Sequence, residues 1–140
     1  MGTLKRNEAG IIHNSTHSFR YNPITRCAYS YDWWCFIKPI GSCVVYNDYH
    51  YSNTTRKHQA MGRNLQKYDL IVETTLSLDN PNWFDDAIEH AEGEICKLTA
   101  EINKPRSRHA TNERRRKDIV QLRNTINEIC KLKDLSQNSE

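Results

Sequence analysis

The chain has 140 residues, of which 37% are hydrophobic, and this length suits one domain with a modest core. Twenty lysines and arginines against 17 acidic residues give a formal net charge of only +3, so the positions of the cations matter more than their number. No apolar run is long enough to span a bilayer, and the N-terminal residues lead into no signal-peptide core. The five cysteines are odd in number and unlike a secreted disulfide framework. These features exclude a membrane-spanning or disulfide-rich secreted class, and we expect a soluble cytoplasmic protein without a membrane partner.

The N-terminal half has the composition of a β-sheet. Short runs at residues 11–13 and 18–21 favour weak strands around a polar segment. The aromatic stretch CAYSYDWWCFIK, residues 27–38, predicts one strand, and CVVYNDYHY, residues 43–51, predicts the next. Pro39-Ile40-Gly41-Ser42 between them is a turn signal, so the two strands should pair as a hairpin.

A short helix and a further strand are expected next. Ser52-Asn53-Thr54-Thr55 offers helix N-cap residues, and RKHQAMGRNLQKY after it is compatible with a surface helix interrupted by Gly62. Residues 70–78, LIVETTLSL, return to strand character. Asp79-Asn80-Pro81-Asn82 then forms a turn that also caps a helix.

Two long helices are predicted for the C-terminal half. Apolar residues recur at helical spacing in each segment, at Phe84, Ile88, Ala91, Ile95, Leu98 and Ile102, and at Ile119, Leu122, Ile126 and Ile129. Two such seams joined by a short connection should pack as an antiparallel pair. The fold class is therefore α+β, with an N-terminal antiparallel sheet and a short helix (8–78), a helical hairpin (82–134) and a frayed tail (136–140), all in one domain.

The connection between these helices is strongly basic. The stretch KPRSRHATNERRRK, residues 104–117, contains five arginines and two lysines. Guanidinium groups bind phosphate through two parallel hydrogen bonds, and free amides at a helix start also favour an anion. The apolar seam of the second helix, extended backwards, reaches Arg115 and Asn112, so this end faces either solvent or something charged. We predict a local site for a phosphate-bearing ligand, with a solvated basic surface as the alternative.

A second basic helix start lies in YSNTTRKHQ, residues 51–59. Its hydroxyl groups, with Arg56, Lys57 and His58, could form another anion site, although this segment alone favours a capped surface helix with ordinary side chains. Trp83 and Phe84 open the first long helix, where either ring could stack on a base or belong to the core.

Catalytic and metal sites are disfavoured. His50 and His109 formally match the H-x-T/S pair of two-histidine phosphoesterases, but such pairs lie on apolar strands and His109 sits in a basic turn. Cysteines at 27, 35 and 43 lack the close C-x-x-C pair of zinc sites. We expect no enzyme activity, no cofactor and no metal.

Two of these pieces carry a family resemblance. The segment YSNTTRKHQ, entered from VVYNDYHY, and the helical pair joined by PRSRHATNERR together resemble the phage-encoded first Thoeris anti-defence family, over roughly residues 44–130. The resemblance implies an antiparallel sheet with two long helices, assembled as a homo-oligomer (dimer or hexamer) in the host cytoplasm. It implies a sponge, which binds a cyclic ADP-ribose isomer (glycocyclic ADP-ribose) between protomers and releases it unchanged. Some members of the family also bind cyclic di- or trinucleotides at a separate site.

Residue roles follow from this resemblance alone. It assigns Arg106, Arg108 and Arg115 to the ligand phosphates and Asn112 to a polar contact. Trp83 or Phe84 would stack on the base, and Arg56 and His58 of the other motif would either bind ligand or shape the fold.

Three other classes of function remain open. A small nucleic-acid-binding module is the main alternative, although the acidic segment 79–94 would repel a long polyanion. A structural oligomeric protein would bind no ligand, and a phosphodiesterase would use His50 and His109.

Overall fold

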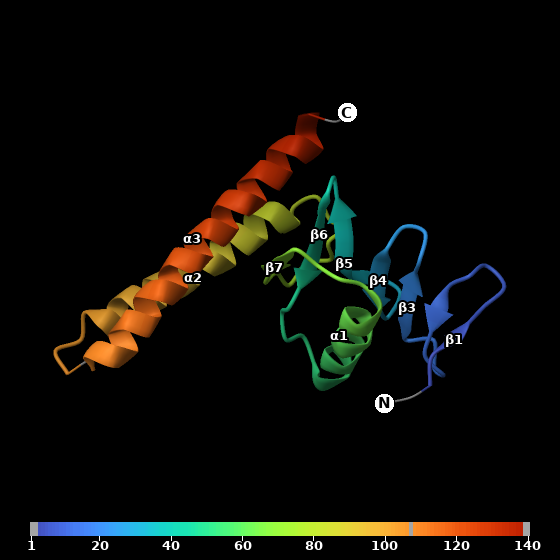
Figure 1. The fold of residues 1–140 in the computed structure, drawn as a ribbon, viewed down its shortest axis with the longest axis horizontal. Coiled ribbons are helices and arrows are strands. Elements are labelled where there is room, and N and C mark those ends of the chain that lie inside the picture. Colours follow the sequence, from blue (N-terminus) through green and yellow to red (C-terminus); the bar gives the residue numbers. More distant parts are fainter. Residues whose placement is uncertain (1–2, 107, 139–140) are drawn as a thin grey trace. The chain divides into compact units, whose positions relative to one another are not determined.

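The computed structural model describes residues 3–106 and 108–138 (Figure 1). The chain divides into two compact units, Met1–Trp83 and Phe84–Glu140. The boundary falls at the start of the first long helix, so the sheet and the helical hairpin are separate bodies.

The first unit is a seven-stranded sheet whose strands follow one another in sequence order. Its strands are β1 (Lys5–Arg6), β2 (Ile12–His13), β3 (Phe19–Asn22), β4 (Cys27–Ser30), β5 (Trp34–Ile40), β6 (Cys43–Asn47) and β7 (Leu70–Val72). The strands from β1 to β6 pair antiparallel, as predicted, but β7 pairs parallel to β6. The prediction of a purely antiparallel sheet was therefore wrong. The helix between β6 and β7 carries the chain back along the sheet, so β7 enters in the same direction as its neighbour.

The aromatic stretch 27–38 is a hairpin rather than the single strand that its composition predicted. The chain reverses between β4 and β5, where Tyr31 and Asp32 both have a positive φ, of 57° and 68°. Two successive left-handed residues give the tight turn whose twist matches paired strands, and glycine or asparagine normally marks it. Because Tyr31 and Asp32 are neither glycine nor asparagine, the turn between β4 and β5 was not predicted from the sequence. The following hairpin, β5–β6, turns at Gly41 as expected.

Helix α1 (Asn53–Leu65) covers one face of this sheet, and Ser52 Oγ caps it by accepting a hydrogen bond from the Thr55 amide. The helix approaches the sheet closely at Gly62, where a Cβ would lie 2.7 Å from Phe36 Cε2. Phe36 and Ile37 both belong to the core because a β-bulge in β5 turns two successive side chains to the same face. Gly62, which looked like a helix interruption, is thus a packing requirement.

Residues 73–82 follow β7 without regular structure, so the predicted strand 70–78 is confirmed only for its first three residues. Hydrogen bonds that involve side chains attach this segment to the sheet. Asn47 Nδ2 donates to the Thr74 carbonyl at 2.8 Å, and Ser77 Oγ accepts from the Cys35 amide at 2.9 Å. These bonds, with one backbone bond from the Leu78 amide to the Cys35 carbonyl at 2.9 Å, attach the segment to the sheet without a regular ladder.

The long helices are α2 (Trp83–Ile102) and α3 (His109–Asn138), which lie side by side and antiparallel (Figure 1). Every predicted seam residue is buried or half-buried. Lys133 Nζ joins Asp85 Oδ1 at 2.7 Å near one end of the pair. Helix α3 continues to Asn138, into the segment expected to fray, whereas residues 139–140 lie outside the described part. Among the described helices, none combines the length and apolar character needed to cross a membrane.

Candidate functional site

The end of the hairpin where α2 finishes and α3 begins carries an open depression of about 280 Å³. Four cationic side chains, one carboxylate and one hydroxyl line it, from Glu101, Lys104, Arg106, Arg108, Thr111 and Arg115. The three arginines that were predicted to bind phosphate therefore share one surface. The local charge is strongly positive, although the net charge of the chain is only +3.

Asn112 holds the two helices together beneath this depression. Its side chain is 8% exposed, and its Nδ2 lies 3.5 Å from the Ile102 carbonyl at the C-terminal end of α2. The last carbonyls of a helix lack intrahelical partners, so this long contact gives one of them a donor. The sequence placed Asn112 on the apolar seam, and in the structure its side chain contacts both the end of α2 and Arg115.

Arg115 is positioned by two neighbours. Its Nη1 donates to Asn112 Oδ1 at 3.0 Å, and its Nη2 lies 3.8 Å from Glu101 Oε2. Lys104 Nζ approaches the other oxygen of Glu101 at 2.6 Å. Hydrogen bonding from Lys104, with a smaller contribution from Arg115, lowers the pKa of Glu101. Glu101 was not singled out in the sequence, and its place as the last residue but one of an amphipathic helix gave no indication of this role.

Arg106 and Arg108 differ from Arg115, because neither has an ion-pair partner among the residues that the structure describes. Both are exposed. The Arg108 carbonyl accepts from the Asn112 amide at 2.9 Å, so Arg108 is the N-cap residue, directly before α3 begins at His109. The first amides of a helix point outwards unpaired and its dipole favours negative charge, and the first turn of α3 contains no acidic residue. Two exposed guanidinium groups and a helix start thus lie together at this end of the hairpin.

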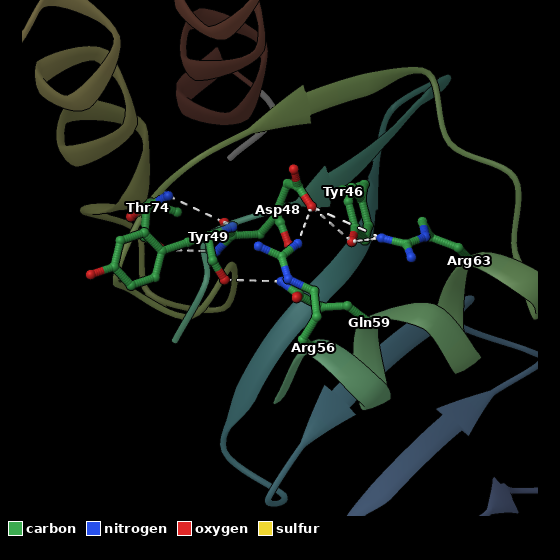
Figure 2. A network of polar contacts seen from close by, with 8 residues as sticks. Tyr46, Asp48, Tyr49, Arg56, Gln59, Arg63 and Thr74 are labelled. Atoms are coloured by element: carbon green, nitrogen blue, oxygen red, sulfur yellow. Dashed lines mark hydrogen bonds and ion pairs between the residues drawn. The ribbon is translucent and has the colours of Figure 1, made fainter. Parts of the chain in front are cut away.

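The second basic helix start, at α1, is organised differently (Figure 2). Arg56 Nη1 lies 2.7 Å from Asp48 Oδ1, and Arg63 Nη1 donates to the Tyr46 hydroxyl at 2.7 Å. The Arg63 guanidinium also lies 5.6 Å from the centre of the Tyr46 ring. The guanidinium groups of Arg56 and Arg63 are therefore bound within the fold, whereas Lys57 is exposed.

Gln59 is a buried member of the network drawn in Figure 2. It is fully buried, and its Nε2 donates to the carbonyls of Asn47 and Tyr49, at 2.9 and 3.0 Å. These bonds fix the loop from β6 to α1 against the helix. The Gln59 side chain was not predicted from the sequence, where it appeared as an ordinary surface residue.

His58 lies in the core rather than at a surface site. It is 2% exposed, its Nδ1 is 2.7 Å from Ser30 Oγ, and its Nε2 is 3.1 Å from Ser18 Oγ. Burial lowers the pKa of this imidazole and favours the neutral form. Both ring nitrogens have partners, so of the two roles considered for His58 the geometry favours shaping the fold.

The predicted stacking residues are also buried. Trp83 is 1% exposed and Phe84 is 6% exposed, so a base could stack on either ring only after the surrounding residues had moved. His109, the candidate acid or base, has a highly exposed side chain 3.4 Å from Glu113, one turn along the same helix. In the described ranges, no cluster of three or more histidine, cysteine or acidic side chains could hold a metal ion.

Comparisons with protein-family models, with curated proteins and with solved structures gave no match to this chain. The case for function therefore depends on the chemistry of the hairpin end and on the sequence resemblance described above.

Proposed function

We propose that this chain is a phage anti-defence protein that binds a cyclic nucleotide immune signal at the hairpin end and keeps it from its receptor without cleaving it. The ligand that the resemblance suggests is glycocyclic ADP-ribose, with cyclic di- or trinucleotides as further candidates. The observation that carries the proposal is the depression with four cations and one carboxylate, in which Arg106 and Arg108 have no partner among the described residues.

The chemistry of these cations suits a phosphate ligand. Arginine stays charged at every physiological pH, and its planar group matches two phosphate oxygens at once. Charge-assisted hydrogen bonds of this kind contribute about 1.5–3 kcal/mol each. Two such arginines beside a helix start would supply most of the affinity that a pyrophosphate group requires.

The same lining supports retention rather than cleavage. Its only carboxylate, Glu101, is bonded to Lys104, and its lowered pKa makes it a poorer proton acceptor. General base catalysis needs a group whose pKa lies near the working pH. The lowered pKa of Glu101 moves it away from that range, which favours a binding protein over a phosphodiesterase.

The size of the depression favours a site shared between protomers. Sites for small molecules usually enclose about 300–1,000 Å³, and they bury most of the ligand. An open depression of about 280 Å³ covers a diphosphate but leaves the base and sugars in water. A second copy of the chain, placed over the hairpin end in a dimer or hexamer, would complete the enclosure.

The proposal is tested by retention of an intact ligand. The purified chain is incubated with glycocyclic ADP-ribose, separated from free nucleotide by filtration, and then denatured, and the released material is analysed. Intact nucleotide that appears only after denaturation supports the proposal. A cleaved product contradicts it, and so does failure to retain this ligand and cyclic di- and trinucleotides. Binding to any DNA or RNA with a steep salt dependence would instead identify a nucleic-acid-binding module.

A further inference from the structure

One residue in the lining of the depression at the hairpin end is not explained by a phosphate ligand. The described lining consists of four cations, one hydroxyl on Thr111 and one carboxylate on Glu101. Phosphate oxygens carry negative charge and accept hydrogen bonds, so cations and hydroxyl donors suit them. An ionised carboxylate also only accepts, and it repels a phosphate. A ligand that contacts the whole lining must therefore carry hydrogen-bond donors as well as phosphate.

Glu101 is held in this lining by cations on both of its oxygens. Lys104 Nζ lies 2.6 Å from Oε1, and Arg115 Nη2 lies 3.8 Å from Oε2. The other Arg115 nitrogen, Nη1, donates at 3.0 Å to Asn112, which is buried. These contacts favour the ionised carboxylate, so Glu101 accepts hydrogen bonds at neutral pH and donates none.

The cations of the depression fall into two sets with different chemistry. Arg106 and Arg108 are exposed, and the parts of the chain that the structure describes give them no ion-pair partner, so this set suits a group of acceptors such as a diphosphate. Lys104 and Arg115 lie beside Glu101, so this set combines donors with an acceptor. A vicinal diol matches such a combination because each hydroxyl both donates and accepts. Carboxylates bind ribose hydroxyls in this way in dinucleotide sites.

We propose that Glu101 accepts hydrogen bonds from ribose hydroxyls of the ligand, and that the site selects nucleotides that carry a diphosphate next to a hydroxylated ribose. This inference rests on the proposed function and adds the chemical class that the depression prefers. Most of the sugar lies outside the depression, and its hydroxyl edge meets Glu101 at the rim, where the Glu101 side chain is 42% exposed. An ADP-ribose isomer carries both groups, whereas a cyclic di- or trinucleotide has no diphosphate and ranks below it.

Two nucleotides that differ only in the ribose hydroxyls test this role. The full chain is titrated calorimetrically with ADP, with 2′,3′-dideoxyadenosine diphosphate and with inorganic pyrophosphate, which has no ribose. The wild type should prefer ADP to the dideoxy analogue about fivefold, a modest ratio because water competes at an exposed carboxylate. In Glu101→Gln this preference should fall below about twofold, while pyrophosphate should bind about threefold more tightly because a repelling charge is gone. A residue that only held Lys104 and Arg115 in place would not change the two affinities in opposite directions.

Glu113→Gln is the matched control. It removes the same charge from α3, at a side chain that is 62% exposed and outside the described lining, and it should keep the preference for ADP. Equal wild-type affinities for ADP and its dideoxy analogue, or a preference that survives Glu101→Gln, would overturn the role of Glu101 even where glycocyclic ADP-ribose is retained. Failure of the wild type to bind pyrophosphate would overturn this inference and the phosphate site together. Glu101→Ala gives the same readout where the glutamine variant does not fold.

Discussion

The two basic helix starts of this chain are similar in sequence and differ in the partners of their cations. At α1, Arg56 is paired with Asp48 and His58 is inside the core. At α3, Arg106 and Arg108 face solvent, and neither has an ion-pair partner in the described part of the chain. A cluster of cations predicts an anion site only when the acids that could neutralise it lie elsewhere. Asp48 is such an acid close to α1, whereas the described residues that line the depression at the hairpin end are four cations, one carboxylate and one threonine.

The largest expected effect is on the folding of the α1 region. His58→Ala removes a buried ring and leaves Ser30 Oγ, which is fully buried, without its partner. We expect the free energy of unfolding to fall by about 2–4 kcal/mol, measured by chemical denaturation. Lys57→Ala, a substitution at the exposed neighbouring residue, is the control and should change it by less than about 0.5 kcal/mol. Equal effects from the two variants would show that His58 is not a core residue.

The next effect is on ligand binding at the hairpin end. Arg108→Ala removes a charge-assisted contact to phosphate and should weaken nucleotide binding about tenfold to a hundredfold, without loss of helix content. Calorimetric titration with glycocyclic ADP-ribose measures this change. Arg123→Ala, at an exposed position further along α3, is the matched control and should leave the affinity unchanged. If both variants weakened binding alike, the overall positive charge of the helices, rather than a specific site, would account for the affinity.

A smaller effect is expected for the closure of the hairpin. Asn112→Ala removes the contacts to the Ile102 carbonyl and to Arg115 Nη1. The loss should be about 1 kcal/mol, and amide exchange should accelerate near residues 100–115 while the other end of α3 keeps its protection. Unchanged exchange at the hairpin end would mean that Asn112 does not hold the helices together.

The buried imidazole also predicts a dependence of stability on pH. The pKa of His58 is lowered in the folded chain, so below about pH 6.5 the unfolded chain binds more protons. The contribution of His58 to stability is complete above that pH and is lost as the pH falls toward the folded-state pKa. Denaturation of the wild type and of His58→Gln between pH 5 and 7 measures it, with at most about 1.4 kcal/mol lost per pH unit. An identical slope in both proteins would contradict the assignment.

The smallest effect is expected at Arg56. Its pair with Asp48 is partly exposed, with side-chain exposures of 38% and 36%, so Arg56→Ala should lower the free energy of unfolding by less than about 1 kcal/mol. Affinity for the nucleotide should not change. A loss of affinity as large as that of Arg108→Ala would place the α1 region in the ligand site and would remove the contrast between the two helix starts.

The sequence predicted the long helices well because their apolar residues repeat over about five turns in the first helix and about three in the second, and a long periodic signal outweighs local exceptions. It failed at the β4–β5 turn because Tyr31 and Asp32 adopt a left-handed conformation that tertiary contacts impose and composition does not indicate. The parallel pairing of β7 was missed for a related reason, since strand direction depends on the path of α1 rather than on the residues of the strand.

The site residues also divide into those whose position could be predicted from the sequence and those whose position could not. The gathering of Arg106, Arg108 and Arg115 on one surface could be predicted because they flank a single short connection. The roles of His58 and Gln59 could not, because their partners, Ser18, Ser30 and the Asn47 carbonyl, come from strands up to 40 residues away. Burial of a polar side chain is a property of the assembled sheet, and no local pattern reports it.

The central claim is that ligand binds at the start of α3 and not at the start of α1, and amide hydrogen exchange tests it most directly. Exchange is measured by mass spectrometry on the full chain, with and without glycocyclic ADP-ribose. The account predicts slower exchange in residues 101–115 and unchanged exchange in residues 52–63. Slower exchange confined to residues 52–63 would contradict it.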